Sequence, residues 1–120
     1  MESRNLKISF NKSGSGSYTP RISLPVTWVR EMSISEEDRE VIISLCEDFI
    51  MVRKKDFNFL ADSIEDRSEN KKVSFNKSGS GSINSRVILP MSFVKHLDIN
   101  TENREVVAIF ENGVIKIKKA

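Results

Sequence analysis

The sequence has only one cysteine, Cys46, and only one histidine, His96, among its 120 residues. A single thiol cannot form an intramolecular disulfide, and one cysteine with one histidine cannot supply the ligands of a Cys/His zinc site. Cys46 lies in an apolar run, where cysteine usually acts as a small buried hydrophobic residue. No Ser/His/Asp or paired-acid arrangement is evident either, so we expect neither an enzyme nor a bound metal or cofactor.

Long apolar runs and a strong excess of one charge are also missing. No stretch approaches the ~20 apolar residues that a membrane-spanning helix needs. The charged start of the chain, residues 1–5, does not resemble a secretory signal, so we expect a cytoplasmic protein with no membrane association. The net charge of +2 is too small to indicate a polyanionic partner by itself. The distribution of the charges therefore matters more than their sum.

What the sequence does contain is an internal repeat. Residues 7–55 align with residues 72–120 without a gap, at a constant offset (72 − 7 = 65). The segment Ser-Phe-Asn-Lys-Ser-Gly-Ser-Gly-Ser at residues 9–17 recurs letter for letter at 74–82. A repeat of this kind fixes the domain organisation. We predict one module over residues 6–55 and a second over 71–119, joined by an acidic linker over 56–70.

Each module shows the same order of structural signals. Alternating residues at 6–10 and 72–75 predict a first strand, and a Gly/Ser-rich loop follows it. A second strand at 21–24 and 86–89 ends at a proline, which suits the first turn of a helix. We expect this short helix to end near Met32 and Leu97, and to place Trp28 and Phe93 in the core. Strand pairs at 40–45 with 49–53, and at 105–110 with 114–118, complete the modules, and a short helix is possible over 61–67 in the linker.

These signals predict a mainly β protein with one short helix in each module. About 48 residues arranged in this way cannot bury much apolar surface, so a single module should be only marginally stable. Two modules that pack together can share one core. We therefore expect the modules to associate, either within one chain or between chains.

The charges are divided unevenly along each module. From residue 3 to residue 30, and again from 71 to 95, every charged residue is basic, and the acidic residues lie elsewhere. If the two leading segments lie side by side, they form a basic face that suits a phosphate backbone. The alternative is that these are ordinary solvated residues on exposed strands. The Gly/Ser loops are likewise either simple hairpin connections or segments whose backbone N–H groups and hydroxyls approach phosphates.

The ordered set of motifs resembles the AbrB/MazE/SpoVT family of DNA-binding modules. The resemblance rests on the basic first strand, the glycine-containing loop, Arg-x-x-Leu-Pro, the short helix, Ile-Ser-Glu-Glu-Asp-Arg-Glu-Val at 34–41 and a final hairpin ending in lysine. It implies a swapped-hairpin β-barrel in which two modules interlace. Because both modules lie on one chain, a monomeric pseudo-dimer is the preferred architecture, with a homodimer as the alternative. The loop at residues 13–20 is longer than the common form.

The resemblance also implies a function, that of a sequence-selective transcription regulator that binds double-stranded DNA, either a transition-state-type repressor or an antitoxin-like autorepressor. Arg21 and Arg86 match the family's arginine before the helix, Lys12 and Lys77 the basic residue ending the first strand, and Arg30 and Lys95 a basic helix position. The full set of expected DNA-binding residues is Lys7, Lys12, Ser13, Ser15, Arg21, Arg30, Lys72, Lys77, Ser78, Ser80, Arg86 and Lys95. The alternative is a module that captures a cognate protein, such as a toxin or a nuclease, with Phe57, Phe59 and Leu60 of the linker as candidate contacts.

Overall fold

The structure is a computed structural model, and it describes residues 2–12, 14, 16–55, 67–77, 79 and 81–120. Several sequence-based predictions fall outside these residues. They are the loop serines Ser13, Ser15, Ser78 and Ser80, the linker residues Phe57, Phe59 and Leu60, and most of the linker helix predicted over 61–67.

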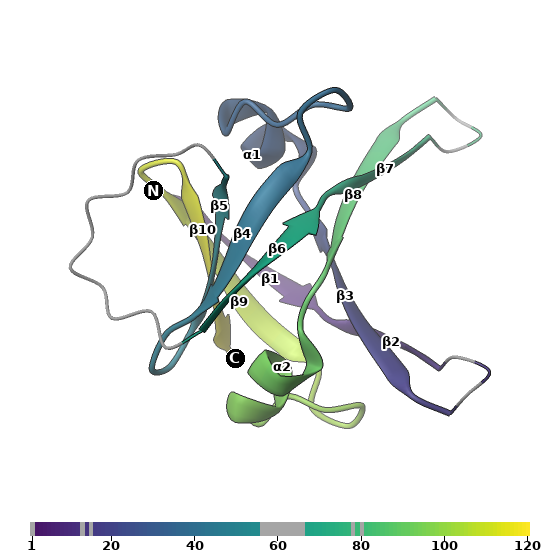
Figure 1. Cartoon of the computed structure of the whole chain (residues 1–120), viewed down its shortest axis with the longest axis vertical. Helices are drawn as coiled ribbons and strands as arrows, with labels where there is room; N and C mark the ends of the chain where they lie inside the picture. The colour runs from purple at the N-terminus through teal and green to yellow at the C-terminus, as the bar shows by residue number, and fades with distance from the viewer. Residues whose placement is uncertain (1, 13, 15, 56–66, 78, 80) are drawn as a thin grey trace.

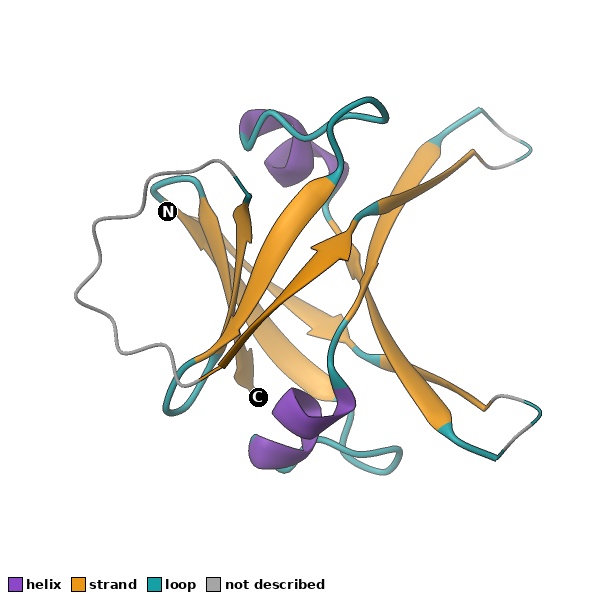
Figure 2. Cartoon of the chain, in the orientation of Figure 1, coloured by secondary structure: helices purple, strands orange, loops and turns teal. Residues whose placement is uncertain are grey.

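The described residues form a mainly β protein with two short helices, as predicted (Figure 2). The first copy contains β1 (Glu2–Lys7), β2 (Ser9–Lys12), β3 (Tyr18–Leu24), α1 (Val26–Glu31), β4 (Glu40–Leu45) and β5 (Ile50–Lys54). The second copy repeats this order with β6 (Arg67–Lys72), β7 (Ser74–Lys77), β8 (Ile83–Ile88), α2 (Met91–His96), β9 (Glu105–Glu111) and β10 (Val114–Lys119).

The first predicted strand of each copy is in fact two strands. Ile8 separates β1 from β2, and Val73 separates β6 from β7. Both residues are fully buried, and their N–H groups donate to the carbonyls of Arg104 and Arg39, each at 3.0 Å. Because the chain turns inward at these two residues, each leading segment continues from one sheet into another.

The boundaries of the modules also differ from those predicted. Strand β1 begins at Glu2, ahead of the predicted start at residue 6. Strand β6 begins at Arg67, so residues 67–70 belong to a strand and not to the linker. The polar composition of this segment hid the strand, because it pairs along only one edge and most of its side chains are exposed.

The strands form two antiparallel sheets, and each sheet contains strands of both copies. The six-stranded sheet has the order β1-β9-β10-β5-β4-β6, and the four-stranded sheet has the order β2-β3-β8-β7. The expectation of a closed barrel is wrong, because the two sheets stay separate. The β2–β3 and β7–β8 hairpins extend away from the body and do not curl back to pair with it (Figure 1). A barrel requires every strand edge to find a partner.

Equivalent residues face each other where the two copies pair. In the four-stranded sheet Ile22 lies opposite Val87, and in the six-stranded sheet Met51 lies opposite Lys116. Both pairs are separated by the repeat offset of 65 (87 − 22 and 116 − 51). The two copies are therefore related by an approximate twofold axis that passes through both pairs.

One apolar core is shared by the two copies. Trp28 and Phe93 are fully buried at equivalent helix positions, as predicted, and Cys46 is also buried. The Trp28 ring stacks on Phe110 of the other copy, with 5.5 Å between ring centroids. This sharing confirms the expectation that the modules associate. Neither described helix is long and apolar enough to cross a membrane.

Candidate nucleic-acid interface

The four-stranded sheet of β2, β3, β7 and β8 carries charge of one sign only. Its charged residues are Lys12, Arg21, Lys77 and Arg86, and none of its strands contains an aspartate or a glutamate. We call this sheet the basic sheet. The acidic residues of the described chain lie on the six-stranded sheet, on the helices and in the turns. The fold thus separates an acid-free surface from a surface of mixed charge.

Arg21 and Arg86 lie at the centre of the basic sheet, on its outer face. Alternate residues of a strand point to opposite faces. Because Ile22 and Val87 are buried against the core, Arg21 and Arg86 point away from it. The two arginines, with Ser74 and Asn76 of β7, line a shallow hollow of about 230 Å³. The twofold arrangement therefore brings together the two arginines that the sequence singled out.

The basic side chains of this sheet have no acidic partner in the part of the chain that the structure describes. Across residues 2–12, 14, 16–55, 67–77, 79 and 81–120, none of the four forms an ion pair. The Nε of Arg21 is nearly inaccessible to water and has no hydrogen-bond partner among these residues. An unpaired guanidinium nitrogen in such a place is costly, so any ligand of Arg21 would have to bind the other nitrogens of its guanidinium group.

Three lysines on or directly after strands of the six-stranded sheet do have acidic partners. Lys54 pairs with Asp38 at 2.8 Å, and Lys55 pairs with Glu40 at 2.9 Å. Lys71 lies 3.6 Å from Glu69. These cations are already compensated within the protein, so they contribute less to an external anion-binding surface.

The two hairpins of the basic sheet form arms that diverge from the point where β3 and β8 pair (Figure 1). Lys12 and Lys77 lie near the arm tips, opposite Tyr18 and Ile83 respectively. Because side chains alternate between the two faces of a strand, Lys12 and Lys77 point to the face of the basic sheet opposite to the face of the arginines. The structure therefore places the lysines and the arginines on one sheet but not on one face.

The backbone at the arm tips is open to approach. Gly16 and Gly81 have positive φ values of 88° and 90°, which suits glycine in a tight turn. A Cβ atom added at Gly14, Gly16, Gly79 or Gly81 would lie more than 4 Å from every described residue except the glycine itself and its two chain neighbours. A ligand such as a phosphate could therefore approach this backbone closely.

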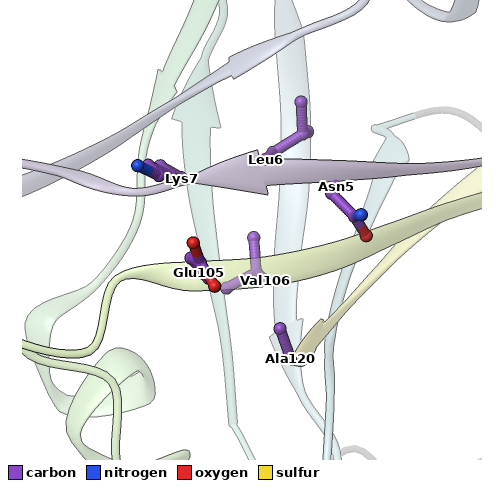
Figure 3. A pocket seen from close by; sticks show the side chains of 6 residues that line it. All are labelled: Asn5, Leu6, Lys7, Glu105, Val106 and Ala120. Atoms are coloured by element: carbon purple, nitrogen blue, oxygen red, sulfur yellow. The ribbon is translucent and has the colours of Figure 1, made fainter.

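Lys7 and Lys72 do not belong to the basic sheet. They end β1 and β6 in the six-stranded sheet, where they lie opposite Glu105 and Glu40 respectively. Figure 3 shows Lys7 and Glu105 on facing strands, at a recess of about 400 Å³ that also contains Leu6 and Val106. The break at Ile8 and Val73 causes this separation, and it places both lysines among acids.

The environment of Glu40 shows how acids and lysines of the six-stranded sheet balance each other's charge. Its hydrogen bond and ion pair with Lys55 lower the pKa of the Glu40 carboxyl, and the positive charge of Lys72 acts in the same direction. Lys72 also shares a recess with Glu36, Glu37 and Asp38. Among the expected DNA-binding residues, Lys7 and Lys72 are therefore the weakest candidates.

Arg30 and Lys95 lie in the last turns of α1 and α2, and both are exposed. The two helices lie on opposite sides of the molecule, away from the arm tips (Figure 1). His96 is exposed beside Lys95, and its Nε2 lies 3.1 Å from the carbonyl oxygen of Glu47. The structure thus does not unite the helix cations with the arginines of the basic sheet.

Four polar residues of the basic sheet were missed by the sequence analysis. Ser9 and Asn11 on β2, and Ser74 and Asn76 on β7, share the outer face with the arginines, because Ser9 pairs with Arg21 and Ser74 pairs with Arg86. Their amide and hydroxyl groups can bind both phosphates and base edges. The sequence could have indicated these residues. Residues 9–17 recur exactly, and strand alternation puts Ser9 and Asn11 together on the face opposite to Phe10.

Within the residues that the structure describes, no three His, Cys, Asp or Glu side chains group as metal ligands would. No protein-family model, curated protein or solved structure matches the chain.

Proposed function

We propose that this chain is a double-stranded DNA-binding regulator of transcription of the AbrB/MazE type, acting in the cytoplasm. The observation that carries the proposal is the basic sheet, which has four basic residues, no acid and no internal ion pair among the described residues. A surface of this kind attracts a phosphate backbone, and the twofold arrangement suits the approximate twofold symmetry of a duplex.

The interlaced pairing of the two copies supports the same proposal. Strand β1 of the first copy pairs with β9 of the second, and β6 of the second pairs with β4 of the first. In our proposal this arrangement is a swapped-hairpin pseudo-dimer, in which one chain supplies both modules.

The shape of the arms suggests how they meet the duplex. The major groove is about 12 Å wide and admits a two-stranded β-ribbon. An arm that enters the groove presents one face to the bases and its tip to the flanking phosphates. Arg21 and Arg86 would then contact the duplex near the twofold axis, and Lys12 and Lys77 would contact phosphates further out.

The direct test is a comparison of charge-matched variants. Binding to a duplex from upstream of the protein's own coding sequence is measured by fluorescence anisotropy, beside a scrambled duplex of equal length. We expect R21A/R86A to lose most of the affinity and K7A/K72A, which removes the same charge from the six-stranded sheet, to keep it. Tighter binding to the upstream duplex would support autorepression. Equal loss in both variants, or no binding by the native chain, would refute the proposal.

A further inference from the structure

The approximate twofold axis is broken at the centre of the basic sheet. Arg21 lies opposite Ile88, whereas its counterpart Arg86 lies opposite Ser23. Ser23 and Ile88 are equivalent positions in the repeat (88 − 23 = 65), so each arginine has a different neighbour on the outer face. Ile88 is 38% exposed, although it is a large apolar residue on a polar surface.

The two arginines differ accordingly. Arg21, beside the larger Ile88, is half-buried, and its Nε is nearly inaccessible to water. Arg86, beside the small Ser23, is exposed. The sequence gives both positions the same residue, but the fold gives them different surroundings.

A second pair of outer-face positions also differs. Thr19 lies opposite Asn11 in the first copy, and its counterpart Asn84 lies opposite Asn76 in the second. Ser9 with Ser74, Asn11 with Asn76 and Arg21 with Arg86 are identical pairs. The two copies thus have the same residue at most outer-face positions and differ at two of them, Thr19/Asn84 and Ser23/Ile88.

We propose that the chain binds a non-palindromic DNA site in one fixed orientation, an inference that rests on the proposed function. The residues that determine this orientation are Thr19, Ser23, Asn84 and Ile88. An apolar side chain such as Ile88 contacts the methyl group of thymine, and an asparagine such as Asn84 forms two hydrogen bonds with adenine. Strand pairing puts Asn84 on the second copy's side of the twofold axis, whereas Ile88, opposite Arg21, lies on the first copy's side, so the adenine contact and the thymine contact fall in different half-sites. A homodimer of one module cannot make this distinction, because its two faces are identical.

The first test is selection from a pool of random duplexes of about 30 bp. The wild type is expected to select a motif whose two halves differ. The variant N84T/I88S, whose second copy has the outer face of the first, is expected to select a palindrome. All substituted residues lie on the outer face of the sheet, so the midpoints of thermal unfolding should match the wild type.

The second test measures orientation directly. An iron chelate that cleaves DNA is attached to G14C, at an arm tip where an added side chain has free space. On the selected duplex, cleavage is expected in one half-site only, the one that lacks the adenine contacted by Asn84. In the exchanged variant T19N/S23I/N84T/I88S, cleavage is expected to move to the other half-site. Exchanging a single contacted base pair between the halves should weaken wild-type binding about 5- to 150-fold.

The outcomes separate this inference from the function on which it rests. If the wild type selects a perfect palindrome, or if cleavage stays in the same half-site after the exchange, the inference is overturned while DNA binding stands. If no protein enriches any duplex, the proposed function fails, and the inference fails with it.

Discussion

The salt dependence of DNA binding is the most quantitative consequence of the charge distribution. Each phosphate that a protein neutralises on B-DNA contributes about −0.9 to the slope of log K against log salt concentration. If the four cations of the basic sheet each neutralise one phosphate, the slope is about −3.6. Affinity then falls about 150-fold between about 50 and 200 mM salt.

Matched variants assign this slope to particular side chains. Lys12 and Lys77 carry no ion pair within the described residues, so K12A/K77A should change the slope by about +1.8. Lys7 and Lys72 face Glu105 and Glu40, so K7A/K72A should leave it nearly unchanged. The net charge of the two variants is the same, which makes the second a control for long-range electrostatics.

The assay is fluorescence anisotropy with one labelled duplex, repeated at five or more salt concentrations for the wild type and both variants. The reasoning is refuted if the wild-type slope is close to zero, because binding would then not release counterions. It is also refuted if both variants change the slope equally. A slope near −7, about 0.9 for each of eight cations, would show that all eight expected basic residues contact DNA, although the structure divides them among the two sheets and the helices.

Three further predictions concern individual residues. A Cβ added at Gly14 has open space beyond its chain neighbours, so G14A should change the free energy of unfolding by less than about 1 kcal/mol in urea titrations, and it should weaken DNA binding if phosphates approach the arm tip. Gly16 has a φ of 88°, so G16A should also destabilise the free protein in the same titrations. W28A removes a fully buried ring that is stacked on the other copy and should cost about 3–5 kcal/mol in the same titrations; a loss below about 1 kcal/mol would contradict the shared core. Lys55 lowers the pKa of Glu40, so the ionised Glu40 carboxylate stabilises the fold above the ordinary glutamate pKa, and this stabilisation is lost as pH falls through the lowered value. K55A should return the pKa of Glu40 toward the ordinary value in an NMR titration, and an unchanged pKa would contradict the ion pair.

Much of the local structure could be predicted because the chain is repeated. A single Pro-led helix of six residues is a weak signal, but Pro25 and Pro90 occur at equivalent positions before similar apolar patterns. Both helices begin directly after these prolines, and the aromatic residues at equivalent positions are buried as expected. Two occurrences of each pattern reduce the chance that any one of them is accidental.

The strand breaks could not be predicted. Ile8 and Val73 continue the alternation of their segments, so the sequence favours one uninterrupted strand. Their burial and their hydrogen bonds to Arg104 and Arg39 exist only after residues far apart in the chain have come together. For this reason the sequence placed Lys7 and Lys12 on one surface, whereas the structure places them on two sheets.

The sequence by itself determined that there are two equivalent modules, where the two helices and most of the strands lie, and that residues 3–30 and 71–95 lack acids. Only the tertiary structure decided which cations share a surface. Arg21 and Arg86 meet because β3 and β8 pair across the twofold axis, at a separation of 65 residues (86 − 21). The physical reason is that local propensity and alternation act over a few neighbouring residues, whereas the pairing of strands from different copies depends on burying a core that neither copy completes alone.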